Sequence, residues 1–159
     1  MTIITYPNPI LRQKTSDIDV SKFGKSSLRE LGKDMIKTMY KARGVGLAAP
    51  QIGENIRLAV IAKETSDRYP GEDLNLKQNI ILINPYIIAH SVETDTLEEG
   101  CLSLPGVLVD VERSVWIKVR ADDFRNRPYD FQARGFFARV VQHEVDHLDG
   151  VLIIDKKVL

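Results

Sequence analysis

Residues 136–148 read FFARVVQHEVDHL, and this stretch decides how the fold is organised. Its apolar residues recur at helical spacing on more than one side, which predicts a helix packed in the interior, with Gly150 at its end. His143 and His147 are four residues apart, so on a helix both imidazoles project from one face and can bind one metal ion. Glu144 stands beside the first histidine, where a carboxylate can handle the proton of a water bound to that ion.

The same three polar side chains could instead form the polar face of a surface helix. However, the predicted helix is apolar on both sides of QHEVDH. Ionisable groups in an apolar helix cost folding energy unless they are paired or bound to a metal. The metal-binding interpretation is therefore favoured, and a third ligand has to be found.

The third ligand is expected upstream of the helix. In the commonest metalloproteases it is a His or Glu downstream of the motif, but the twelve residues after His147 contain neither. The run HEVDHLDGVLI follows the metzincin spacing as far as Gly150 and then has Ile153 where that pattern needs a third His. Asp149 and Asp155 remain alternatives, although Asp149 lies in a predicted helix-ending turn and neither fits a known spacing.

Cys101 is the strongest candidate for that ligand. It is the only cysteine and lies in EEGCLSLPG, residues 98–106. A thiolate with two imidazoles leaves one coordination position open for water, as a catalytic metal site requires. A cysteine in a Leu-rich segment is otherwise more often a small buried hydrophobe. A helix motif that lacks one ligand favours the metal-binding role.

The remaining pattern predicts an α+β fold. A first helix is predicted from a capping box at Ser27 and Glu30, with Gly44 able to end it. We expect one domain over residues 1–159, with short mixed or antiparallel β-sheets around the central helix that carries the His-Glu-x-x-His motif. Strands are predicted at residues 57–62, 80–83 and 115–119, an exposed loop at 64–78 and a turn at 125–128.

Composition limits the functional classes. Lys plus Arg and Asp plus Glu both number 22, and a net charge of zero argues against a dedicated nucleic-acid binder. No apolar run reaches membrane-spanning length, and the first residues lack the basic and apolar segments of a secretion signal. A single cysteine excludes an internal disulfide framework, so a reducing, cytoplasmic location is expected.

Three segments together resemble the signature motifs of the peptide deformylases. They are GVGLAAPQ at residues 44–51, EGCLS at 99–103 and QHEVDH at 142–147, and they occur in the order of that family. PNPILR at residues 7–12 is also similar to the family's N-terminal segment. The resemblance covers most of the chain. It implies a metal-dependent hydrolase that removes the N-formyl group from the formyl-methionine of nascent polypeptides.

The resemblance also implies how the site works. Cys101, His143 and His147 would hold one divalent ion, with a water in the fourth position. Glu144 would act as general base towards that water and then as acid towards the departing amine. The family favours Fe²⁺ as the native ion, with Zn²⁺ or Ni²⁺ as alternatives.

Further residues acquire roles through the same resemblance. The side-chain amide of Gln51 and the backbone N–H of Leu102 would stabilise the oxyanion together with the metal. The methionine side chain of the substrate would enter an apolar pocket, although ordinary core packing explains Phe136 and Val140 equally well. The residues expected to contact substrate are Val45, Gly46, Glu99, Gly100, Phe136 and Val140, with His143 also contributing to the methionine pocket.

Some features concern residues around the site. Family members often pair the glutamate before the ligand cysteine with a later arginine, so we expect a Glu99–Arg113 pair; two separate surface charges are the alternative. Leu108 stands near a position where many members carry a substrate-binding arginine, and Arg139 stands where an apolar residue is common. The chain ends soon after the motif helix, so we expect no C-terminal docking helix for association with the ribosome.

Two other functions fit parts of the pattern. A metal-dependent hydrolase of another amide or peptide would cleave substrates that carry no formyl group. A non-catalytic structural metal domain would fill the fourth coordination position with another Cys or His, and the only unused histidine is His90. A nucleophilic Cys101–His pair is weaker, because both motif histidines are better explained as ligands.

Overall fold

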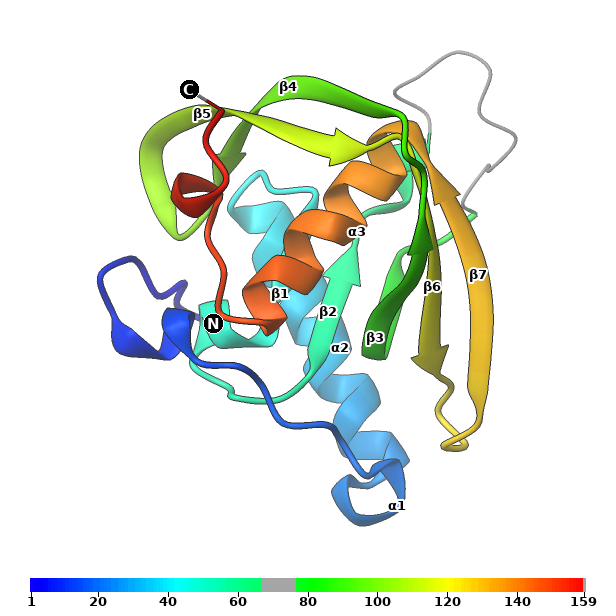
Figure 1. The fold of residues 1–159 in the computed structure, drawn as a ribbon. Helices are drawn as coiled ribbons and strands as arrows, with labels where there is room; N and C mark the ends of the chain where they lie inside the picture. Colours follow the sequence, from blue (N-terminus) through cyan, green and yellow to red (C-terminus); the bar gives the residue numbers. More distant parts are fainter. Residues whose placement is uncertain (67–76, 159) are drawn as a thin grey trace.

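Two antiparallel sheets and two long helices build the computed structural model, which describes residues 1–66 and 77–158 (Figure 1). The larger sheet has the strand order β1-β2-β3-β6-β7, and β4 pairs with β5 in a separate two-stranded hairpin. The predicted α+β class is therefore confirmed, with antiparallel pairing. The strands are β1 Gly46–Ala48, β2 Leu58–Ile61, β3 Ile80–His90, β4 Thr94–Cys101, β5 Leu104–Ser114, β6 Trp116–Asp122 and β7 Pro128–Arg134; the helices are α1 Val20–Phe23, α2 Lys25–Lys41 and α3 Gly135–Leu148.

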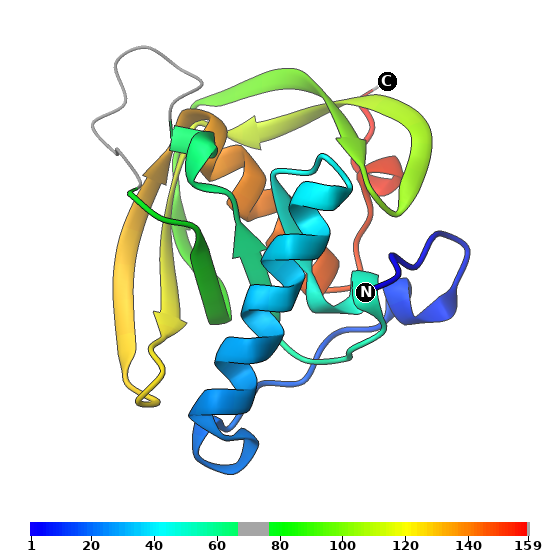
Figure 2. The same cartoon turned by 180° about the vertical axis from the view of Figure 1, so that it is seen from behind.

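Strand β2 lies between the two long helices. Leu58 and Val60 belong to the core cluster that also contains residues of α2, whereas Ile61 belongs to the cluster with residues of α3. Seen from behind, α2 crosses the sheet (Figure 2). All four residues of β2 are fully buried because both faces of the strand are covered. This explains why the strand reads as a continuous apolar run rather than as an alternating one.

Helix α3 occupies the centre, with the five-stranded sheet on one side and the hairpin β4–β5 across it (Figure 1). Phe137 and Val141 pack with Ile117 and Val119 of β6 in one apolar cluster. The helix begins one residue before the predicted start, and Gly150 follows its C-cap with a positive φ of 76°. The motif-bearing helix and its end are therefore confirmed.

The start of α2 differs from the prediction. Gly24 is its N-cap, with φ at +92°, and the helix has no side-chain cap at this end. Ser27 lies inside the first turn, so the predicted capping box at Ser27 and Glu30 is wrong. The reason is that α1 ends at Gly24 and α2 begins directly after it, which requires a backbone conformation that glycine adopts readily and serine does not.

The predicted strands at residues 57–62, 80–83 and 115–119 correspond to β2, the start of β3 and the start of β6. Most of the predicted loop at 64–78 falls on residues outside the described ranges, while Lys63–Ser66 forms a short 3₁₀ helix; the other 3₁₀ helices are Pro9–Arg12, Ala49–Ile52 and Ile153–Asp155. No described helix has the length and apolar character needed to cross a membrane.

Candidate metal centre and active site

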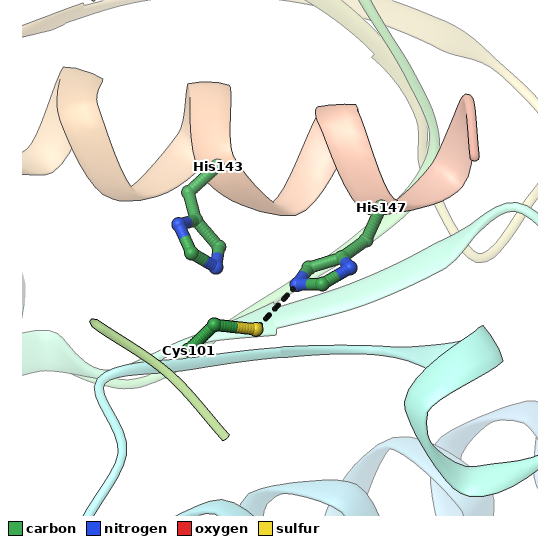
Figure 3. Close-up of side chains that lie close together, drawn as sticks. All are labelled: Cys101, His143 and His147. Atoms are coloured by element: carbon green, nitrogen blue, oxygen red, sulfur yellow. Dashed lines mark hydrogen bonds between the residues drawn. The ribbon is translucent and has the colours of Figure 1, made fainter. Parts of the chain in front are cut away.

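Helix α3 and the end of β4 bring together three side chains of types that can bind a metal ion. The sulfur of Cys101 and one ring nitrogen from each of His143 and His147 all lie within 4.8 Å of one another. Both histidines point from the same face of α3 towards the cysteine (Figure 3). Cys101 Sγ is 3.2 Å from His147 Nε2. Asp149 and Asp155, the other candidates, are held elsewhere by Arg57 and Arg12.

The chemistry of these side chains fits a divalent metal ion. Nδ1 of His143 lies 3.0 Å from Oε2 of Glu99, which fixes the ring and leaves Nε2 available as a ligand. Burial lowers the pKa of His147 well below its ordinary value, so this imidazole is neutral, which is the form that binds metals. One thiolate and two imidazoles suit Zn²⁺ and Fe²⁺ alike.

The pKa of His143 shifts in the opposite direction from that of His147. Burial on its own would lower the pKa of His143, but hydrogen bonds with Cys101 and Glu99 outweigh it and raise the pKa to about 10. The surroundings of this ring therefore stabilise a positive charge. A divalent cation at the three ligands would supply such a charge.

Glu144 is a buried carboxylate that follows His143 in α3. Only 3% of the residue is exposed, and its Oε2 has no hydrogen-bond partner among the described residues. Burial raises the pKa of Glu144 to about 7, the range in which a side chain can both take up and release a proton near neutral pH. The carboxylate fits here because Gly46 has no side chain: a β-carbon at that position would lie 2.2 Å from Oε1 of Glu144.

Gln51 directs its amide nitrogen towards Cys101. Its Oε1 accepts a hydrogen bond of 2.9 Å from the backbone N–H of Ala48, so the orientation of the amide is determined. Nε2 then lies 3.1 Å from Ser103 Oγ and 3.8 Å from Cys101 Sγ. A fixed N–H donor therefore lies next to Cys101. Sequence reasoning missed Ser103, although it belongs to the EGCLS segment.

A cavity of about 450 Å³ lies beside this centre. All of the predicted site residues line it except His147, which is almost fully buried. Sequence reasoning missed Leu97 and Glu98 as lining residues because strand β4 was not predicted. The lining residues are Val45, Gly46, Gln51, Leu97, Glu98, Glu99, Gly100, Cys101, Leu102, Phe136, Arg139, Val140, His143 and Glu144.

The predicted Glu99–Arg113 pair is present and buried. Arg113 donates to the carboxylate through Nε at 2.6 Å and through Nη2 at 2.9 Å. Burial would raise the pKa of Glu99, but the hydrogen bonds from Arg113 and His143 outweigh it and hold this pKa well below its usual range. The alternative of two separate surface charges is wrong, since both side chains are less than one tenth exposed.

The residues noted as departures from the family pattern have different positions. Leu108 is exposed on β5, opposite Gly100 of β4. Arg139 lines the cavity, yet only 4% of the residue is exposed and its guanidinium is bound to Glu99 and Asp95. His90 is exposed on β3 and does not belong to the metal-binding group.

Comparison with known proteins agrees with this geometry. The family model for polypeptide deformylase matches residues 1–158. A peptide deformylase of Prochlorococcus marinus is 45% identical, with 99% of this chain and 73% of that protein covered. One of Dictyoglomus thermophilum is 44% identical, with 95% and 88% covered. The crystal structure of peptide deformylase from Thermotoga maritima superposes with a TM-score of 0.85 at 39% identity, covering 99% of this chain and 97% of that one. The chain therefore belongs to the polypeptide deformylase family.

Proposed function

We propose that this chain removes the N-formyl group from the formyl-methionine of nascent polypeptides by metal-dependent hydrolysis. The observation that carries the proposal is the convergence of Cys101, His143 and His147 next to a cavity that is lined by the buried carboxylate of Glu144, in a member of the polypeptide deformylase family. A non-catalytic structural metal domain would leave this carboxylate without a use, since its Oε2 has no hydrogen-bond partner among the described residues.

Cys101, His143 and His147 are the proposed metal ligands. A divalent ion held by them would supply Lewis acidity, which polarises a carbonyl and lowers the pKa of water. We propose Fe²⁺ as the native ion, with Zn²⁺ or Ni²⁺ able to occupy the same site, since sulfur and imidazole ligands bind all three ions.

Glu144 is the proposed proton carrier. Its carboxylate takes a proton from the water that attacks the formyl carbon and then gives a proton to the amine nitrogen as the C–N bond breaks. Formate and the free N-terminal amine are the products. The pKa of about 7 that burial gives to Glu144 matches both halves of this exchange.

Gln51 and Leu102 are the proposed oxyanion donors. As the formyl carbon becomes tetrahedral, its oxygen gains negative charge, and N–H donors already aimed at that oxygen stabilise it without reorganisation. The hydrogen bond from Ala48 to Gln51 Oε1 fixes the amide nitrogen on the side of Cys101, where this oxygen would lie. The backbone N–H of Leu102 is the second proposed donor.

The cavity is the proposed site for the start of the substrate chain. Val45, Phe136 and Val140 provide apolar surface for the methionine side chain, and Gly46 and Gly100 line the same cavity, where the substrate backbone would pass. Glu99 is better placed to orient His143 than to bind substrate, because its carboxylate is already held by Arg113. Formylated chains emerge from the ribosome, so we propose that the protein acts in the cytoplasm, near the ribosome.

Formate release tests the proposed function. Protein loaded with Fe²⁺ or Co²⁺ without oxygen is given a formyl-Met tripeptide, and parallel reactions contain the N-acetylated and the unmodified tripeptide. The proposal predicts formate from the first and no cleavage of the other two. Hydrolysis of the acetylated or unmodified peptide at a comparable rate would instead support a hydrolase of another amide.

A further inference from the structure

The proposed metal centre is assembled from two pieces of the fold that share no sheet. Helix α3 carries His143 and His147, while Cys101 ends strand β4 of the separate two-stranded hairpin. The cavity lies between the same two pieces, since residues 97–102 and residues 136–144 both line it. The distance between the sulfur and the two imidazoles therefore depends on whatever fixes the hairpin against the helix.

A stripe of side chains on α3 faces a stripe on β4. Arg139, His143 and His147 follow one another at intervals of four residues, which places them on one face of the helix. Asp95, Leu97, Glu99 and Cys101 alternate along β4, which places them on one face of the strand. The two stripes meet in order: Arg139 contacts Asp95 and Glu99, His143 contacts Glu99, and His147 contacts Cys101.

Arg139 is the part of this interface that binds both strands of the hairpin. Its Nη1 donates to Glu99 Oε1 at 2.7 Å and to the backbone carbonyl of Val111 on β5 at 2.9 Å. Its Nη2 donates to the backbone carbonyl of Asp95 at 3.0 Å and also to the Asp95 side chain. One guanidinium on α3 thus holds two carboxylates and two main-chain oxygens of the hairpin, in a position where its side chain is 5% exposed.

Arg113 makes the corresponding connection from the hairpin to the helix. It lies on β5, holds Glu99 with two hydrogen bonds, and reaches Asp146 of α3 through Nη1 at 2.8 Å. Because Arg113 already fixes the carboxylate of Glu99, the distinct contribution of Arg139 is to the hairpin backbone at Asp95 and Val111. Each buried cation has an acidic partner, as buried charges require.

We propose that Arg139 is a positioning residue that clamps the Cys101-bearing hairpin onto α3 and so sets the distance between the sulfur and the two histidines. The inference rests on the proposed metal site but not on the identity of the substrate. Loss of the clamp should loosen the hairpin and displace Cys101 from His143 and His147. The fold should survive, because the stem of Arg139 can be replaced by an apolar side chain of similar length.

The test compares Co²⁺ binding by Arg139→Met, Arg139→Lys and the wild type. Apparent affinity is measured by competition with a chelator, and the thiolate-to-cobalt charge-transfer band reports whether the sulfur of Cys101 remains bound. Groups that orient metal ligands typically change metal affinity by about 10–100-fold when removed. We expect a loss of about tenfold in Arg139→Met with a weakened band, and an intermediate value in Arg139→Lys, which keeps a cation beside Glu99.

Val141→Ala is the matched control. Val141 is fully buried on the same helix but packs in the apolar cluster with β6 residues, so its truncation weakens the fold without touching the hairpin clamp. This variant should lose thermal stability and bind Co²⁺ as the wild type does. Co²⁺ affinity of Arg139→Met within twofold of the wild type, or an equal loss in Val141→Ala, would overturn the proposal. Failure of the wild type itself to bind Co²⁺ would instead contradict the proposed metal site.

Discussion

Gly46 lies directly against Glu144: a β-carbon at position 46 would be 2.2 Å from Oε1 of the carboxylate and 2.8 Å from its carbon. Strand β1 and helix α3 therefore approach so closely that only a residue without a side chain fits between them. This contact sets the position of Glu144, the proposed proton carrier. Its Oε2 has no hydrogen-bond partner among the described residues that could hold the carboxylate instead.

Gly46→Ala should consequently displace the Glu144 carboxylate while the metal ligands stay in place. Misplacement of a reacting group by about 1 Å typically costs about 100-fold in rate, so we expect kcat for formate release to fall by that order. Bound metal per chain should remain as in the wild type. A variant with normal kcat, or one that loses its metal together with its activity, would show that this contact does not position Glu144.

Cys101→Ala tests the ligand set. Removing the sulfur leaves two imidazoles, and the Co²⁺ affinity should fall by more than the roughly 10–100-fold that loss of an orienting group causes. The thiolate-to-cobalt charge-transfer band should be absent. Retention of wild-type Co²⁺ affinity would mean that another side chain completes the site.

Gln51→Ala tests the oxyanion donor. Loss of one preorganised donor typically costs about 2.7–4 kcal/mol of transition-state stabilisation, which corresponds to a decrease of about 100- to 1,000-fold in kcat. The KM should change little, because the donor acts on charge that develops only in the transition state. Ser103→Ala removes a partner of the Gln51 amide but not the amide itself. Its kcat should therefore lie between that of the wild type and that of Gln51→Ala. A large rise in KM with unchanged kcat in Gln51→Ala would argue for simple substrate binding.

The buried ion pair of Glu99 should make the free energy of unfolding depend on pH in the acidic range. The folded-state pKa of Glu99 is held below the ordinary carboxyl value of 4.5 by Arg113 and His143, against the opposing effect of burial. A depressed carboxyl pKa contributes stability above the unfolded pKa, and this contribution is lost as the pH falls below about 4.5. Glu99→Gln should therefore be less stable by about 3 kcal/mol at pH 7, as expected for a broken buried ion pair.

Urea unfolding of metal-free protein between pH 7 and pH 3 measures this contribution. The difference in unfolding free energy between wild type and Glu99→Gln should shrink steadily below about pH 4.5. A difference that stays constant over this range would show that the ion pair does not account for it.

Local patterns were enough to predict the motif helix and the two histidines that share one of its faces. The four-residue spacing of His143 and His147 and the apolar residues around them lie within one element, so the sequence carries both signals directly. The same holds for β2, whose apolar run follows from burial on both faces. The pairing of Glu99 with Arg113 and the roles given to Gln51 and Leu102 came from family resemblance rather than from local pattern.

The hairpin β4–β5 could not be predicted in this way. A strand is recognised by apolar residues that alternate with polar ones, but the inner face of this hairpin carries Asp95, Glu99 and Arg113, which are held by ion pairs with one another and with α3. Charged residues on the inward face hide the period of two. The contacts of Arg139 with the hairpin could not be predicted either, since its partners at Asp95 and Val111 become neighbours only in the folded chain.

The most direct test of the account compares formate release from a formyl-Met tripeptide by the wild type and by Glu144→Gln at equal metal content, without oxygen. Gln keeps the shape of the side chain but cannot carry the proton, and positioned proton transfer contributes about 100- to 10,000-fold in rate. The account predicts formate release by the wild type and a loss in that range for Glu144→Gln. Absence of formate from the metal-loaded wild type, or a loss smaller than about tenfold in the variant, would contradict it.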